Sequence, residues 1–283
     1  MTGHTGKVVA ETLLAAGKSV RVVVRDAAKG AEWAARGAEV AVADLGDPAA
    51  LGAALQGTEG AWLLLPPRIA PGFAAYQREL GAALVEGVRR GRPGHVVFLS
   101  SIGAQLPAGT GPIAGLHPVE KGLRAVAAET GIAVTLLRAG YFMENLGGSL
   151  GALAQGVLPG FVPTDLPIDM IATQDIGAQA AKLLLAGGAG VQVVELGGGP
   201  GYSMDDCAVA LSELMGKQVA AIEAPLDSMV ETLTGFGMPA DVAEMYREMN
   251  AGFVAGTIVW EGGHQRVPST TPPKAVLAGL LGA

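Results

Sequence analysis

The feature that most constrains the fold is an alternation of short apolar runs with helical patterns over residues 20–196. Each apolar run has the length of a buried strand, is bounded by turn residues, and is followed by a helix-length segment. Parallel strands need such crossover segments. The predicted strands cover 20–24, 38–43, 61–65, 96–100, 133–137 and 191–196, and the predicted helices cover 27–36, 48–55, 72–89, 116–130 and 174–185. This pattern predicts an α/β fold with a doubly wound parallel sheet.

A glycine motif, Thr2-Gly3-His4-Thr5-Gly6, opens the chain at the entrance of a further helix. Glycine allows the backbone to approach a ligand closely, and the free N–H groups of a helix N-terminus favour a negative charge. A dinucleotide-binding fingerprint has a third small residue where this chain has Val9. We predict a phosphate-binding turn, in which His4 either contacts a phosphate or fills a loop position.

A doubly wound sheet normally has its first strand before this turn, at the centre of the sheet. Only Met1 precedes Thr2 here. Without that strand its two neighbours would keep unpaired edges, which are costly to bury. We expect that the start has lost roughly five residues, a typical strand length. A chain complete as given would bring cofactor binding into question.

Beyond residue 150 the alternation loosens, and Pro159, Pro163 and Pro167 interrupt the chain. Helical patterns then cover 227–235 and 239–253, and a last helix closes the chain. We predict a dinucleotide-binding Rossmann domain over 1–150, to whose sheet 170–196 returns. A smaller α+β substrate lobe would cover 151–283.

Composition excludes several classes of function. The chain has 283 residues and a net charge of −7, and an acidic protein has no electrostatic footprint for nucleic acid. The longest apolar runs are too short to cross a bilayer, and no basic-then-apolar leader opens the chain. We therefore expect a cytoplasmic protein that binds neither nucleic acid nor a membrane.

Cysteine and histidine usage gives no metal site. The single cysteine, Cys207, excludes an intramolecular disulfide, and its apolar helical neighbours favour a buried role. Histidines and carboxylates do not share a metal-ligand spacing. We expect no metal.

Charged residues follow the predicted strands 20–24 and 38–43. Arg25 stands where a Rossmann-type domain meets the adenosine ribose, and its planar fork suits a 2′-phosphate. Lys29 lies nearby and supports NADP(H), whereas Asp26 could instead bind the ribose hydroxyls of NAD(H). Asp44 either accepts from the adenine amino group or begins the turn before Pro48. These residues favour NADP(H) over NAD(H).

Several segments together resemble a known family. They are Thr2-Gly3-His4-Thr5-Gly6, Val20-Arg21-Val22-Val23-Val24-Arg25-Asp26, Phe98-Leu99-Ser100-Ser101, Leu137-Arg138-Ala139-Gly140-Tyr141-Phe142-Met143-Glu144-Asn145 and Tyr202-Ser203-Met204-Asp205-Asp206. These segments occur in this order and extend over nearly the whole length. With them the chain resembles the NmrA-like branch of the atypical short-chain dehydrogenase/reductase superfamily. That family includes NADPH-dependent reductases of quinones, dyes and other conjugated apolar compounds, and also non-catalytic nicotinamide sensors.

The resemblance implies roles for individual residues. Gly3, Thr5 and Gly6 would contact the pyrophosphate, Arg25 the 2′-phosphate and Asp44 the adenine. The remaining contacts would be Leu65 and Pro66 at the middle of the cofactor, Ser100 below the nicotinamide, and Tyr141, Phe142 and Asn145 beside the nicotinamide and substrate. Met229 and Met245 in the lobe are spaced for helical packing, and they either fill the core or line a pocket for apolar ligands.

Short-chain dehydrogenases generally use Tyr-x-x-x-Lys, and the same spacing here reads His117-Pro118-Val119-Glu120-Lys121. An imidazole titrates near neutrality, so His117 could replace the tyrosine as proton donor while Lys121 holds the ribose. Pro118 also suits the first turn of a helix, which would leave His117 as a residue beside the cap without chemistry.

Two functions follow from these residues. The first is an NADPH-dependent reductase that transfers hydride to a conjugated apolar acceptor such as a quinone. The second is a non-catalytic NADP(H) sensor that acts through a protein partner, and the missing tyrosine suits both. A homodimer is an expectation from the family.

Overall fold

The computed structural model describes residues 3–197, 199 and 201–282. At its centre lies a five-stranded parallel sheet with the order β11-β9-β5-β4-β3. The strands are β3 (Gly60–Leu64), β4 (His95–Ser101), β5 (Ala133–Ala139), β9 (Val191–Gly197) and β11 (Gln265–Pro268). β5 is buried at every position, as expected for a strand covered on both faces.

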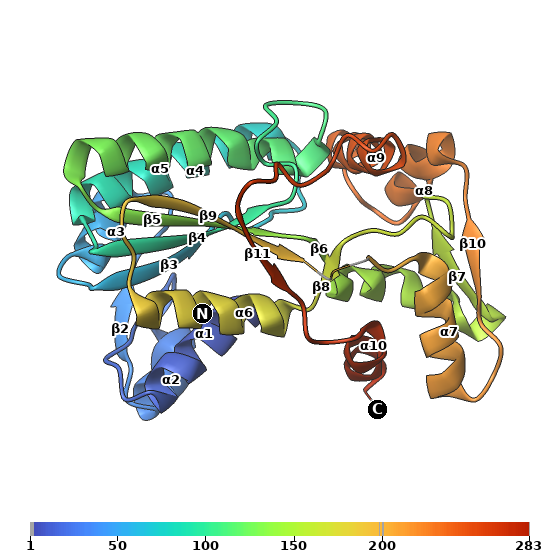
Figure 1. Cartoon of the computed structure of the whole chain (residues 1–283), viewed down its shortest axis with the longest axis horizontal. Helices are drawn as coiled ribbons and strands as arrows, with labels where there is room; N and C mark the ends of the chain where they lie inside the picture. The colour runs from blue at the N-terminus through green and yellow to red at the C-terminus, as the bar shows by residue number, and fades with distance from the viewer. Residues whose placement is uncertain (1–2, 198, 200, 283) are drawn as a thin grey trace.

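Helices cover both faces of this sheet (Figure 1). One face carries α3 (Pro48–Leu55), α4 (Phe73–Gly91) and α5 (Leu116–Thr130), and the other carries α1 (His4–Ala15) and α6 (Thr173–Ala186). Each face has its own apolar core: Phe98 and Leu123 belong to the first, and Val97 and Ile176 to the second. The predicted α/β fold is confirmed.

Two further strands form a separate sheet. β1 (Arg21–Val24) pairs in parallel with β2 (Glu39–Val42), next to η1 (Ala27–Gly30) and α2 (Ala31–Ala35). Within the described residues no ladder joins β1 to β3, although both belong to one sheet in the doubly wound order. The central first strand of that order would lie between them. That a strand precedes residue 2 stays a prediction.

The strand β11 was not predicted. It follows the lobe in the sequence but extends the central sheet by pairing with β9. Three of its four residues are exposed, so it lacks the apolar alternation by which strands are recognised. The start of α3, by contrast, has a local sequence signal. Asp47 caps this helix by accepting from the N–H groups of Ala49 and Ala50.

The remaining elements gather on the right in Figure 1 and form the lobe. It contains the parallel pairs β6 (Tyr141–Phe142) with β8 (Met170–Ile171) and β7 (Val157–Gly160) with β10 (Ala220–Glu223). Its helices are η2 (Gly111–Gly115), η3 (Met143–Gln155), α7 (Met204–Met215), η4 (Leu226–Ser228), α8 (Met229–Gly235), α9 (Ala240–Val254) and α10 (Pro273–Leu281).

The lobe has an apolar core of its own, which includes Cys207, Met249 and Phe253. Burial raises the pKa of the Cys207 thiol to about 12, in keeping with the predicted buried role. None of the helices in the described ranges combines the length and the apolar character of a membrane span.

Candidate functional site

The first part of the candidate site is the start of α1. The helix begins at His4 with Gly3 as its N-cap, so Thr5 and Gly6 lie in its first turn rather than in a preceding loop. No side chain caps this end and its first turn has no acidic residue. A Cβ at Gly3 would meet no atom within 4 Å. The free N–H groups therefore form an open, positively polarised helix end.

Arg25 and Lys29 lie at the same end of the fold. The chain turns back from α1 into β1, and Arg25 directly follows the last residue of β1. Both side chains are exposed, and no hydrogen bond or ion pair holds either of them within the described residues. Asp26 differs, because its carboxylate caps η1 by accepting from the N–H of Ala28 at 2.9 Å.

The other residues predicted for the cofactor follow β2 and β3. Asp44 is exposed and accepts from the N–H of Gly46 at 2.8 Å, so it begins a turn. Leu65 and Pro66 are half-buried beyond β3. The carbonyl oxygen of Pro66 accepts from the Tyr76 hydroxyl at 3.2 Å, which fixes this segment to α4.

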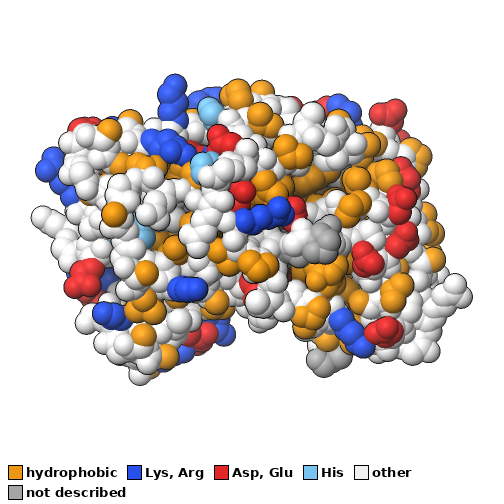
Figure 2. Space-filling model, in the orientation of Figure 1, with side chains coloured by type: hydrophobic (Ala, Val, Ile, Leu, Met, Phe, Trp, Pro, Cys, Tyr) orange, Lys and Arg blue, Asp and Glu red, His pale blue; other side chains and the backbone are white. Residues whose placement is uncertain are grey.

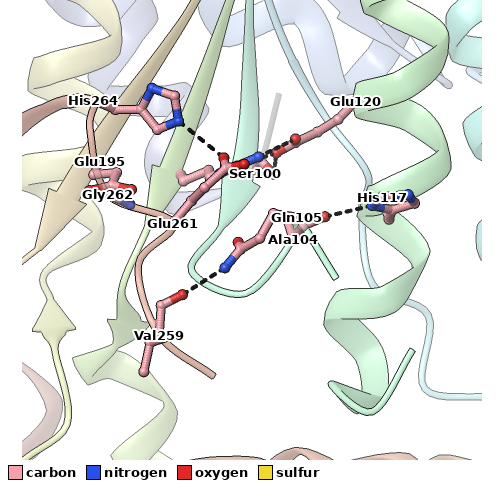
Figure 3. Close-up of polar contacts among 11 residues, drawn as sticks. Ser100, Ala104, Gln105, His117, Glu120, Glu195, Val259, Glu261, Gly262 and His264 are labelled. Atoms are coloured by element: carbon pink, nitrogen blue, oxygen red, sulfur yellow. Dashed lines mark hydrogen bonds and ion pairs between the residues drawn. The ribbon is translucent and has the colours of Figure 1, made fainter. Parts of the chain in front are cut away.

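The first turn of α5 carries the predicted proton donor. His117 is half-buried, and its Nδ1 lies 3.1 Å from the carbonyl oxygen of Ala104 in the loop after β4 (Figure 3). A carbonyl oxygen can only accept, so we assign the Nδ1 proton to this hydrogen bond, which leaves Nε2 as the second ring position. Lys121 lies one turn later and is exposed.

Sequence reasoning missed a chain of charged residues next to this turn. Arg138 of β5 donates to Glu120 of α5 through Nε at 2.9 Å and Nη2 at 2.7 Å. Its Nη1 donates to Glu261 at 2.5 Å, and Glu261 also lies 3.0 Å from Nε2 of His264. The Ser100 hydroxyl donates to Glu120 at 2.5 Å (Figure 3). These contacts join β4, β5, α5 and the segment before β11.

The pair at the centre of this chain is buried. The side chains of Arg138 and Glu120 are only 2% and 5% exposed. Burial alone would lower the pKa of Arg138, but the hydrogen bonds from Glu120 and Glu261 outweigh it and hold that pKa above its ordinary value. An arginine within the mostly apolar run 133–139 was the available signal, since a buried charge requires a partner. Ser100, predicted to contact the cofactor, is itself only 2% exposed.

The predicted substrate residues divide between two cores. Tyr141 packs edge-on against Phe253 in the lobe, with ring centroids 6.2 Å apart, while Phe142 packs into the core beneath α6. Burial raises the pKa of Tyr141 to about 12, against a smaller opposing effect of its hydrogen bond with Asn145. Asn145 is exposed.

The two predicted methionines lie on lobe helices. Met229 begins α8 and is buried, and Met245 is half-buried on α9. The neighbouring Glu144 was not predicted as a site residue. Its Oε1 accepts from the N–H and the hydroxyl of Thr173, at 2.8 and 2.6 Å, and so caps α6.

Comparison with known proteins shows which family this chain is similar to. The model of the NmrA-like family matches residues 1–263. Quinone oxidoreductase 2 of Escherichia coli (strain K12) is 31% identical over 258 residues, which cover 90% of this chain and 86% of that protein. NAD(P)H azoreductase of Xenophilus azovorans is 30% identical over 254 residues, covering 88% and 84%.

A solved structure agrees with these relatives. The crystal structure of the NADPH-dependent quinone oxidoreductase of Escherichia coli complexed with NADPH superposes with a TM-score of 0.74. The two chains are 28% identical, and the match covers 98% of this chain and 96% of that one. The chain therefore belongs to the NmrA-like family, within the atypical short-chain dehydrogenases/reductases.

Proposed function

We propose that the protein is an NADPH-dependent reductase that transfers hydride to a conjugated apolar acceptor such as a quinone. The observation that carries the proposal is the open N-terminus of α1 at the same end of the fold as the unpaired cations Arg25 and Lys29. The relatives support it, since one is named a quinone oxidoreductase and the other an NAD(P)H azoreductase, and the structure of the first was solved with NADPH.

The start of the chain fits the phosphates of such a cofactor. Gly3, His4, Thr5 and Gly6 offer backbone N–H groups without a competing cap, which suits the pyrophosphate. Arg25 and Lys29 would hold the 2′-phosphate. Because Asp26 already caps η1, it is less available to ribose hydroxyls, and this favours NADP(H) over NAD(H). Asp44 would lie beside the adenine, and Leu65 and Pro66 beside the middle of the cofactor.

His117 would supply the proton of the reaction. The nicotinamide supplies a hydride, and a quinone that accepts it needs one further proton to become a hydroquinone. In neutral His117, Nε2 carries a lone pair because Nδ1 donates to Ala104, so only the imidazolium can donate from Nε2. Lys121 would hold the ribose after its exposed side chain turns toward the cofactor, and Ser100 would lie beneath the nicotinamide.

The acceptor would lie between the motif after β5 and the lobe. Tyr141, Phe142 and Asn145 would border the nicotinamide, and Met229 and Met245 would form an adaptable apolar wall. The alternative, a non-catalytic NADP(H) sensor, has less support, because the relatives above are named as enzymes. A homodimer and a cytoplasmic location without nucleic-acid binding complete the proposal.

Two measurements on the full chain test the function. Fluorescence titration with NADPH, NADP⁺ and NADH should show preferential binding of NADPH, and NADPH oxidation should depend on an added quinone. Tight discrimination between NADPH and NADP⁺ without turnover would favour the sensor instead. For His117→Ala, we expect kcat to fall about 100-fold, since a positioned general acid usually contributes a factor of this size. Glu213→Ala is the control, since it removes an exposed ion pair with Lys274 between α7 and α10.

A further inference from the structure

The segment that joins α9 to β11, residues 255–264 and named the strap here, passes from the lobe to the central sheet (Figure 1). It has no regular secondary structure, yet it is held at successive positions by side chains of the central sheet and its flanking helices and loops, called the sheet half here. Gln105 Nε2 donates to the carbonyl oxygen of Val259 at 2.9 Å. Arg138 donates to Glu261, and the N–H of Gly262 donates to Glu195 of β9 at 3.0 Å (Figure 3).

These attachments come from groups that the sheet half already holds in place. Glu195 and Arg138 are each 2% exposed, in β9 and β5. Trp260 adds a hydrogen bond from Nε1 to Asp169 at 2.7 Å, next to β8. Two of the strap's attachments therefore come from buried side chains of the central sheet, which gives these hydrogen bonds a fixed geometry.

The helix before the strap is also fixed at its other end. Asp241, in the first turn of α9, accepts from the N–H groups of Gly72 and Phe73 at 2.8 and 3.4 Å, where α4 begins. Between the two ends α9 packs on η2 so closely that a Cβ at Gly111 would lie 2.0 Å from the carbonyl oxygen of Met245. Interfaces between parts of one chain often permit relative motion, but here both ends of α9 are bound to the sheet half.

We propose that the strap positions α9 for acceptor binding, with Glu261 and Gln105 as positioning residues. This inference rests on the proposed function, because Met245 of α9 forms part of the proposed acceptor wall. Loss of the attachments made by Gln105 and Glu261, two of the four described above, would let the C-terminal end of α9 move. The acceptor would then be held in a wider range of orientations. Cofactor binding at α1 and β1 would not change, because neither residue contacts those elements.

Glu261 and Gln105 can be substituted while the buried hydrogen bonds that stabilise the fold remain. Glu261 is 44% exposed, and Arg138 keeps its two hydrogen bonds to Glu120 when Glu261 is removed. Gln105 makes its hydrogen bond at the surface.

The test compares Glu261→Ala, Gln105→Leu and the double variant with the unaltered chain. We expect the double variant to raise KM for a quinone about tenfold, since small displacements of bound reactants have effects of this size or larger. The affinity for NADPH should stay unchanged. Amide hydrogen exchange should accelerate within 255–264, including Gly262. The single variant Glu261→Gln keeps a hydrogen-bond acceptor for Arg138, so its KM for the quinone should lie close to that of the unaltered chain.

Glu213→Ala is the matched control, since it removes an exposed ion pair with Lys274 between α7 and α10, away from the strap. It should change neither KM nor exchange in 255–264. A double variant with faster exchange but an unchanged KM would overturn this inference alone. A parallel loss of NADPH affinity would also overturn it, because it would indicate general destabilisation. Lack of quinone turnover in the unaltered chain would overturn the proposed function, and this inference with it.

Discussion

Arg25 and Arg138 lie at the C-terminal ends of two parallel strands, but their surroundings are opposite. Arg138 is 2% exposed and donates three hydrogen bonds to two carboxylates of the same chain. Arg25 is exposed, and no group of the described chain pairs with it. The first arginine connects parts of the protein, and the second is the one that we propose to bind the 2′-phosphate of the cofactor. The two arginines thus differ in whether the chain itself supplies a partner for the cation.

The largest effect should come from breaking the buried pair. Arg138→Met leaves Glu120 buried without its cation, so we expect the free energy of unfolding to fall by about 3–5 kcal/mol, measured by urea denaturation. The double variant Glu120→Gln/Arg138→Met removes both charges and should recover at least half of that loss. If the single variant costs less than about 1 kcal/mol, the pair is not the central structural contact.

A smaller effect, on binding rather than stability, should follow from altering Arg25. Arg25→Ala should weaken NADPH about 10- to 100-fold, the usual range for loss of a charge-assisted hydrogen bond, and leave NADH and the unfolding midpoint unchanged. Arg36→Ala is the control, because Arg36 is also a surface arginine of this part of the chain but pairs with Glu11. Equal losses for NADPH and NADH would remove the 2′-phosphate assignment.

The smallest effect concerns a buried group at the opposite end of the sheet. His95, at the start of β4, lies 2.8 Å from the Thr135 hydroxyl, and burial lowers its pKa from the ordinary value of 6.5. Below about pH 6.5 the unfolded chain therefore takes up a proton that the folded chain resists, so stability present above this pH is lost as the pH falls.

Urea denaturation at about pH 7.5 and about pH 5.5 measures that loss. His95→Leu should reduce the difference between the two pH values, and His4→Ala, at an exposed histidine, should leave it unchanged. An equal pH dependence in His95→Leu and the unaltered chain would show that His95 does not contribute to it.

The sequence predicted elements whose signals are local. The helix α5 begins and ends where its pattern predicted, because the amphipathic period acts within a few residues. The predicted helix 48–55 likewise matches α3, and Asp47 caps its start. The strand β11 was missed because its pairing with β9 is made over a distance of about 70 residues in sequence and its own residues are mostly exposed.

The residues of the candidate site differ in how far the sequence alone could point to them. The glycine motif and Arg25 could be proposed from the sequence because each is a residue type with a specific chemistry at an expected position, and their roles stay predictions. The partners of Arg138 could not, since Glu120 and Glu261 lie 18 residues before and 123 residues after it. The position of the Lys121 side chain was equally inaccessible, because it depends on which face of α5 meets the sheet.

The pairing of β11 with β9 also affects how the protein can be made. Residues 201–264 emerge from the ribosome between these two strands, and residues 143–169 emerge between β6 and β8. These two insertions supply most of the lobe, whereas its last helix, α10, follows β11. During synthesis β9 remains an edge strand until residue 268 is available, so the sheet is completed only after most of the lobe has been translated.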